Sequence, residues 1–206
     1  MRKILLLVFI ILPVTLSAAM ASERPIRIAI EGQYPPFNYV DKDGAPRGFE
    51  VDLAKTLCEN IERTCTFVVL DWDGMLTGLL AGKVDAVMAS MSITEERKKS
   101  VAFTNKYYEE SGSFVIRKDS DLVISSEGLK GKVIGVQRST TWSTYIEQTY
   151  PDSQIVYFED DNRGCFDLLA GRIDTYLAQS YYMSELVKKT EAKNLAIAGA
   201  SVRDTR

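Results

Sequence analysis

The sequence alternates between short apolar stretches typical of strands and longer stretches with helical spacing of apolar residues. This alternation starts again in the second half of the chain, with the same rhythm but without sequence similarity to the first half. Strands alternating with helices indicate an α/β protein, because a β-sandwich or a helical bundle would show a different order of elements. The pattern therefore predicts an α/β fold with two comparable halves.

The first half is predicted to contain its main strands at 26–30, 66–70 and 84–89. Its helices are predicted at 49–60, at 72–81 and from 95 onward, and the first of them is indicated by four apolar residues at helical spacing. Those four residues are Phe49, Leu53, Leu57 and Ile61. Ser92 or Thr94 is the predicted N-cap of the helix that starts at 95, because a side-chain oxygen there can accept from the first-turn N–H groups.

The second half is predicted to begin with an extended stretch at 114–116, where the chain crosses between domains. Further strands are predicted at 133–137, 155–158 and 175–177, and another before the polar residues 201–206. Helices are predicted over 140–150, up to Gly171, and from Tyr181.

The first 21 residues have the pattern of a secretory signal peptide. Met1, Arg2 and Lys3 form a basic start, residues 4–16 are almost wholly apolar, and Ala19-Met20-Ala21 fits a cleavage site. An uncleaved anchor is the alternative, but the apolar run is shorter than the ~20 residues of a spanning helix. We therefore expect cleavage after Ala21 and export to an oxidising compartment.

The cysteines and the missing histidines limit the chemistry. Cys58 and Cys65 are close enough in sequence to form a disulfide in an oxidising compartment, which leaves Cys165 unpaired. The chain has no histidine, which excludes Ser-His and Cys-His catalysis and leaves zinc almost no ligands. We expect no metal and no cofactor. The chain has a net charge of −3 and contains no long basic run, so no nucleic-acid partner is expected.

Polar loops follow several of the predicted strands, at the positions where α/β sheets bind ligands. Ser90, Met91 and Ser92 lead into a helix that carries Arg97, and free N–H groups beside a guanidinium suit a carboxylate. Spacing alone allows simpler roles. Ser92, Thr140 and Thr141 could only cap helices, Arg97 and Glu31 could be solvated, and Trp72 could belong to the core.

Several long strings in the mature chain carry a family resemblance: "YPPF", "GFEVDLAKTLC", "DWDGMLTGLLAGKVDAVMASMSITEERKKSVAFT", "LKGKVIGVQRSTTW" and "LAGRIDTYLAQS". The chain resembles the periplasmic solute-binding proteins of the polar amino-acid family, which serve ABC importers for lysine, arginine, ornithine, histidine, glutamine and opines. The resemblance implies a two-lobed Venus-flytrap fold, with lobe one at 22–110 and lobe two at 111–206, closing over one small ligand. It also implies a periplasmic monomer whose partner is an ABC permease in the inner membrane.

The same resemblance implies the ligand contacts. Arg97 would bind the α-carboxylate with Ser92 and Thr141, and Ser90 and Ser92 would help to hold the amino group. Tyr34 and Trp72 would enclose the side chain, and Glu31 would meet its distal end. The complete implied set is Glu31, Tyr34, Trp72, Ala89, Ser90, Met91, Ser92, Arg97, Thr140, Thr141 and Gln179.

Glu31 and Gln179 make the predicted ligand more specific. A desolvated carboxylate is unfavourable by several kcal/mol unless it is paired, so the ligand should bring a cation. A guanidinium fits best, because its planar fork matches a carboxylate and stacks on aromatic rings. Gln179 stands where typical members have an aspartate for the α-ammonium, which favours octopine-like or nopaline-like ligands. A plain cationic amino acid remains the alternative.

The family pattern includes a second segment that returns to lobe one, and this segment is expected to be missing here. Two other functions remain open at this stage. A cyclohexadienyl dehydratase-like enzyme could use Glu31 as an acid, and a sensor domain would share the same fold. We expect a non-enzymatic binding protein.

Overall fold

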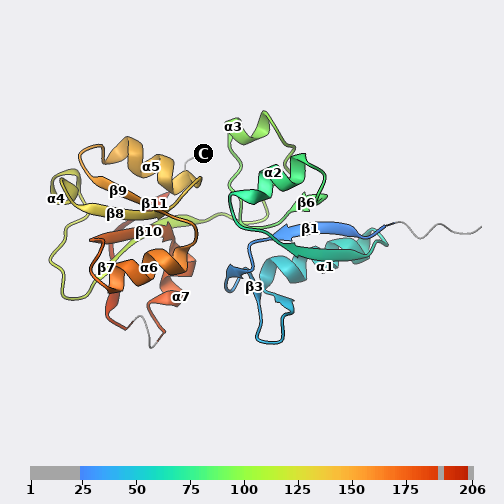
Figure 1. The fold of residues 1–206 in the computed structure, drawn as a ribbon, viewed down its shortest axis with the longest axis horizontal. Helices are drawn as coiled ribbons and strands as arrows, with labels where there is room; N and C mark the ends of the chain where they lie inside the picture. The colour runs from blue at the N-terminus through green and yellow to red at the C-terminus, as the bar shows by residue number, and fades with distance from the viewer. Residues whose placement is uncertain (1–23, 190–192, 204–206) are drawn as a thin grey trace, which may run out of the picture.

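The computed structural model describes residues 24–189 and 193–203, which form two α/β lobes (Figure 1). The predicted signal peptide, residues 1–21, lies outside the described residues. Within the described part of the chain, none of the helices is long and apolar enough to cross a membrane.

The first lobe is built on a three-stranded parallel sheet in the order β5-β1-β6. β1 (Ile26–Ile30) lies in the middle, between β5 (Cys65–Val69) and β6 (Ala86–Val87). A small antiparallel sheet follows β1, formed by β2 (Gln33–Tyr34), β3 (Asn38–Val40) and β4 (Pro46–Arg47). Because the three main strands are parallel, the loops after them leave the sheet at the same edge. Residues 31, 70 and 88 therefore start from one side of the lobe.

Three helices accompany the first sheet: α1 (Phe49–Asn60), α2 (Gly74–Leu80) and α3 (Glu95–Lys98). The bounds of α1 agree with the prediction, but the four apolar residues that predicted it do not form its buried face. Phe49, Leu57 and Ile61 are 46%, 51% and 59% exposed. The buried residues are Glu50, Val51, Ala54 and Cys58. Small side chains such as alanine allow a helix to lie close to a sheet, so the bulkier stripe faces outward.

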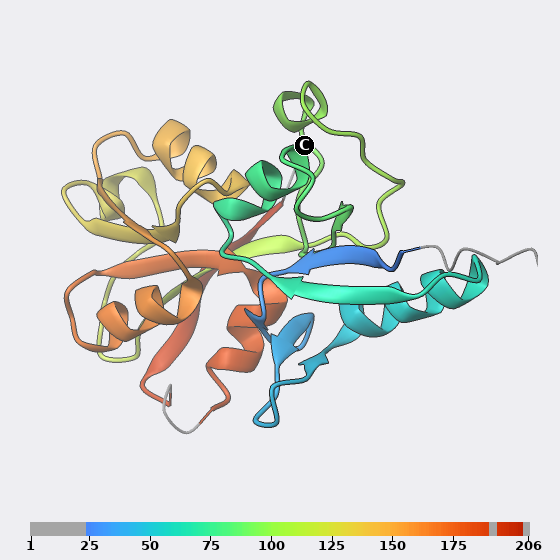
Figure 2. The same cartoon turned by 45° about the vertical axis from the view of Figure 1, so that its right-hand side comes forward.

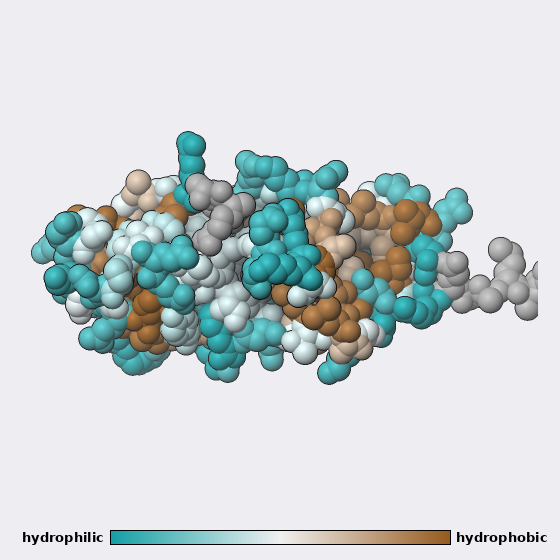
Figure 3. All heavy atoms as spheres, turned by 90° about the horizontal axis from the view of Figure 1, so that it is seen from above, coloured by the Kyte–Doolittle hydropathy of each residue, from teal (hydrophilic) through white to brown (hydrophobic). Residues whose placement is uncertain are grey.

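Apolar side chains gather on the surface of the first lobe, in the right-hand half of the molecule (Figure 3). Val69 and Leu80 of the first lobe are 50% and 62% exposed, and the outward stripe on α1 adds further exposed apolar surface to this lobe.

The structure refines three further predictions for the first lobe. The strand predicted at 84–89 is reduced to two paired residues in β6, and α2 starts at Gly74, so Trp72 lies in the turn before it. Thr94 rather than Ser92 caps α3, because its Oγ1 accepts from the backbone N–H of Arg97 at 3.2 Å.

The second lobe contains a five-stranded sheet in the order β11-β7-β10-β8-β9. Its strands are β7 (Ser111–Arg117), β8 (Val133–Gln137), β9 (Gln154–Phe158), β10 (Thr175–Gln179) and β11 (Leu195–Arg203). β10, β8 and β9 are mutually parallel, and β7 is antiparallel to both of its neighbours. β10 is two residues longer than predicted, because Ala178 and Gln179 pair with β7.

Helices cover both faces of this second sheet (Figure 2). They are α4 (Ser126–Leu129), α5 (Thr141–Thr149), α6 (Asp161–Leu169) and α7 (Ser180–Leu186). One core cluster contains Leu129, Trp142 and Ile146 from α4 and α5. The other contains Leu168 and Met183 from α6 and α7. The sheet is therefore buried on both sides, which fits the apolar character of β8 and β10.

A disulfide between Cys58 and Cys65 joins the end of α1 to the start of β5, as predicted. Cys165 is a free, buried cysteine in α6.

Candidate ligand-binding site

A small cavity of about 30 Å³ lies between the two lobes. Ten of the eleven predicted contact residues line it: Glu31, Tyr34, Trp72, Ala89, Ser90, Ser92, Arg97, Thr140, Thr141 and Gln179. The cavity also contains four residues that sequence reasoning missed: Gln137, Trp142, Asp161 and Ala178. It is smaller than an amino acid, so side chains or whole lobes must move apart before a ligand of that size can enter.

Glu31 directly follows the central strand β1 and is buried, with 9% of its surface exposed. Its backbone N–H donates to Asn38 Oδ1 at 2.9 Å, which fixes the turn. Its carboxylate accepts from Gln137 Nε2 of the second lobe at 2.7 Å. Burial raises the pKa of Glu31 to about 8, and the charge of Asp161 adds to that rise. Glu31 is therefore a desolvated acid facing the cavity rather than a solvated one.

Arg97 connects the two lobes through its guanidinium. Its NH1 donates to the carbonyl of Ser92 at 2.7 Å, and its NH2 donates to the carbonyl of Ser139 at 3.1 Å. The guanidinium carbon lies 5.6 Å from the centre of the Trp72 ring, and Trp72 Nε1 donates to the same Ser139 carbonyl at 3.2 Å. In this structure the Trp72 ring therefore faces Arg97, although it is predicted to contact the ligand side chain.

Tyr34 belongs to an aromatic stack that bridges the lobes. Its ring centre lies 5.4 Å from that of Phe37 in the first lobe and 4.7 Å from that of Tyr182 in the second. Its hydroxyl donates to Gln179 Oε1 at the end of β10. The hydroxyl end of Tyr34 and the amide of Gln179 thus meet at the cavity wall.

The hydroxyl residues of the two loops have distinct partners. Ser90 has a positive φ of 53°, and its N–H and Oγ donate to Glu50 Oε1 at 2.6 and 3.2 Å. The Ser90 hydroxyl that was predicted to help hold an amino group is thus bonded to a buried acid here. Ser92 Oγ and Thr141 Oγ1 lie 3.4 Å apart across the cleft. Thr140 Oγ1 accepts from the N–H of Ser143 and caps α5.

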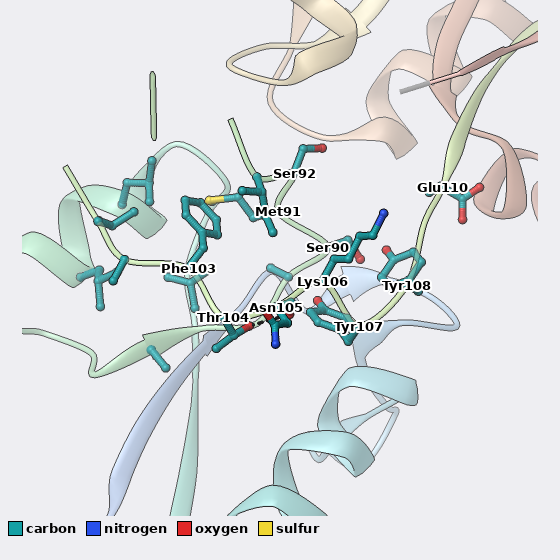
Figure 4. Close-up of a pocket in the computed structure, with 18 of the residues that line it drawn as sticks. Ser90, Met91, Ser92, Phe103, Thr104, Asn105, Lys106, Tyr107, Tyr108 and Glu110 are labelled. Atoms are coloured by element: carbon teal, nitrogen blue, oxygen red, sulfur yellow. Dashed lines mark hydrogen bonds between the residues drawn. The ribbon is translucent and has the colours of Figure 1, made fainter. Parts of the chain in front are cut away.

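Met91 is the one predicted contact residue that does not line the small cavity. It lines a larger neighbouring hollow of about 280 Å³ between β6 and residues 101–110. Figure 4 shows the Met91 side chain directed toward Phe103, whereas the hydroxyl of Ser92 points the other way. Adjacent residues of a chain segment send their side chains to opposite sides when it is extended. The two spaces adjoin, because Ser90, Ser92 and Gln179 line both.

Three of the four missed residues follow the same rule as those that were found. Gln137 ends β8, Asp161 follows β9, and Ala178 lies near the end of β10, so all three occupy the carboxyl edge of the second sheet. Ligands bind α/β sheets at the carboxyl ends of the strands, and this rule was applied to the serine and threonine loops of the sequence but not to these positions. No group of histidine, cysteine or acidic side chains arranged to hold a metal occurs among residues 24–189 and 193–203.

The family model of the bacterial extracellular solute-binding proteins, family 3, matches residues 26–201. The chain belongs to this family. It is similar to the L-arginine-binding protein of Pseudomonas aeruginosa, with 37% identity over 209 residues that cover all of this chain and 81% of the relative. It is also similar to the histidine-binding periplasmic protein of Escherichia coli K12, with 36% identity over 211 residues, all of this chain and 81% of the relative. This solute-binding protein is therefore extracytoplasmic.

Solved structures confirm the two-lobed fold of this solute-binding protein. An ancestral arginine-binding protein bound to arginine superimposes with a TM-score of 0.81 and 31% identity, covering 88% of this chain and 85% of the other. The octopine-binding periplasmic protein of Rhizobium meliloti is 31% identical over 88% of this chain and 70% of its own. An ancestral amino acid-binding protein described as a precursor of cyclohexadienyl dehydratase has a TM-score of 0.78 and 28% identity, covering 88% of this chain and 82% of its own.

Proposed function

We propose that this protein binds a cationic amino acid or an arginine-derived opine outside the cytoplasm and delivers it, as a monomer, to an ABC-type importer in the inner membrane. The proposal includes a cleaved signal peptide at residues 1–21 and lobes at 22–110 and 111–206. One observation carries it: Glu31 is a buried acid at the cavity wall whose side-chain partner is the neutral amide of Gln137. A cation on the ligand would neutralise that acid.

The rest of the cavity suits the other end of an amino acid. Arg97, Ser92 and Thr141 lie together where the lobes meet, and Thr141 is the first residue of α5. A guanidinium, two hydroxyls and the N-terminus of a helix are the groups that bind a carboxylate well. We assign the α-carboxylate of the ligand to these residues and its distal cation to Glu31.

The amine end of the ligand has a neutral partner. Gln179 stands at the cavity wall with Tyr34 and Ser90, and it offers an amide in place of a carboxylate. An amide stabilises an ammonium less than a carboxylate does. A ligand with a substituted amine loses less at such a site than a free amino acid, and for this reason opines belong in the proposal beside arginine.

A thermal-shift screen tests the proposal. Arginine, lysine, ornithine, histidine, glutamine, octopine and nopaline would each be added to purified mature protein, because a ligand that binds the folded state raises the melting temperature. We expect the largest shift from arginine or an arginine-derived opine, and Glu31→Gln should abolish that preference. Equal shifts with glutamine would contradict the proposal.

An enzymatic role is the second candidate, since the dehydratase precursor shares the fold and Glu31 could act as an acid. That precursor is itself described as an amino acid-binding protein. Incubation of the protein with prephenate and arogenate decides between the two roles. We expect no turnover, and catalytic conversion of either compound would favour the enzyme.

A further inference from the structure

Asp161 lies in the candidate site and has no role in the proposed function so far. It is the first residue of α6, three residues after the end of β9, and it lines the same cavity as Glu31. Only 7% of its surface is exposed. Burial raises its pKa to about 7, and it in turn contributes to the raised pKa of Glu31. The cavity thus contains two desolvated acids that act on each other.

The position of Asp161 is fixed by the packing of α6 on the second sheet. Its Oδ1 accepts from the hydroxyl of Tyr176, a fully buried residue of β10, at 2.8 Å. A side chain at Gly164 would overlap the Tyr176 ring, so the glycine lets this helix approach β10 closely. Among the described residues, Tyr176 is the only donor to the Asp161 carboxylate. The carboxylate can therefore accept further hydrogen bonds from a ligand in the cavity.

Three arginines in or beside the cavity-lining segments are engaged elsewhere. Arg163 contacts Glu159 and Asp160, Arg138 contacts Asp73 and Glu159, and Arg97 is directed at two backbone carbonyls. Among residues 24–189 and 193–203, no lysine or arginine forms an ion pair with Glu31 or Asp161. The titratable groups around Asp161 are Asp160, Cys165, Tyr34, Tyr176, Tyr182 and Glu31, all acidic or neutral. Among the described residues the pair thus has no ion-pair partner, and a cationic ligand would supply one.

We propose that Asp161 is a second carboxylate for the distal cation of the ligand and that it makes the site prefer a guanidinium over a primary ammonium. This inference rests on the proposed function. A guanidinium has five N–H donors in one plane and can present one edge to Glu31 and another to Asp161. An ammonium is a compact, strongly hydrated charge, and it loses more hydration in a cavity walled by aromatic rings.

Isothermal titration calorimetry on three proteins tests this inference: wild type, Asp161→Asn and Asp160→Asn. Asp161→Asn keeps the shape and the acceptor for Tyr176 but removes the charge. Asp160→Asn is the matched control, because Asp160 accepts from the N–H of Arg163 as the N-cap of α6, and asparagine caps equally well. Each protein is titrated with arginine and lysine, and with octopine and its lysine-derived counterpart.

We expect Asp161→Asn to lower the ratio of guanidinium to ammonium affinity by about tenfold, the effect of one charge-assisted contact, and Asp160→Asn to change it by less than about threefold. The ligand-free Asp161→Asn protein should melt at or above the wild-type temperature, because a buried like charge is removed. An unchanged ratio in a folded Asp161→Asn protein would overturn the inference alone. Wild-type protein that binds neither kind of cation would overturn the proposed function and this inference with it.

Discussion

The Nε2 atom of Gln137 lies 2.7 Å from the Oε1 atom of Glu31, and this hydrogen bond joins the carboxyl end of β8 to the carboxyl end of β1 across the cleft. The amide satisfies one lone pair of the acid but supplies no positive charge. The raised pKa of Glu31 therefore persists in spite of this bond, which by itself lowers it. Burying this acid without a cationic partner costs free energy, and a cationic ligand would recover part of that cost.

The ligand-free protein should lose stability as the pH rises from 5 to 8. The pKa of Glu31 is raised to about 8, so the folded state holds a proton that the unfolded state has lost above its ordinary pKa. The unfolded state thus binds fewer protons in this window, and the free energy of unfolding falls by up to ~1.4 kcal/mol per pH unit for this group. Urea unfolding of wild type and Glu31→Gln at pH 5 and pH 8 measures it. A wild-type pH dependence identical to that of Glu31→Gln would contradict the prediction.

Replacing Arg97 by lysine should weaken ligand binding by roughly 10–100-fold. Lysine keeps the charge but loses the planar fork, which reaches the carbonyls of both Ser92 and Ser139 and would bind the ligand carboxylate through two bonds. Calorimetry with the best ligand of the screen measures the loss. Lys98→Gln is the matched control, because Lys98 lies next along α3 and pairs with the exposed Glu95. Equal losses in both variants would point to helix α3 rather than to the Arg97 guanidinium.

Replacing Gln179 by aspartate should change the preference between free amino acids and opines. A carboxylate at this position gives an α-ammonium a charge-assisted hydrogen bond, and it repels the extra carboxylate of an opine. We expect arginine affinity to rise by about tenfold while octopine affinity falls. Competition between the two ligands in a binding assay reads out the change, and a parallel rise for both would show that Gln179 does not contact the amine end.

Reduction of the Cys58–Cys65 disulfide should lower the free energy of unfolding by about 2.5 kcal/mol, since the bond closes a short loop between residues seven apart in sequence. Urea unfolding with and without a reducing agent measures it. Cys165→Ala provides the control, because Cys165 is free and buried, and this variant should respond to the reducing agent as the wild type does. An unchanged midpoint in wild type would show that the loop is held by its packing alone.

Strand and helix types follow well from the sequence, whereas the faces that helices present do not. The four apolar residues of α1 correctly predicted its span, but Leu57 and Ile61 point outward and Ala54 and Cys58 point inward. Two stripes with the same period share that helix. Only the distance between helix and sheet, set by tertiary packing, decides which one is buried.

The site residues that lie in or near a family motif could be predicted from the sequence. Arg97 lies in a string that resembles the family, Glu31 lies three residues before another one, and both line the cavity. Asp161 was missed because the carboxyl end of β9 was not considered, and its contact with Tyr176, 15 residues away on another element, cannot be read from the sequence. Met91 is in the contact set that the resemblance implies, and in this structure it lines the larger neighbouring hollow rather than the small cavity.

The affinity ratio of arginine to citrulline on wild-type protein tests the central claim most directly. Citrulline has nearly the shape of arginine but carries a neutral urea where arginine carries its cation, so the two ligands differ mainly in the charge that would meet Glu31. By calorimetry at pH 7.5 we expect arginine to bind at least about 100-fold more tightly, the effect of pairing a buried acid. Equal affinities for arginine and citrulline would contradict the account.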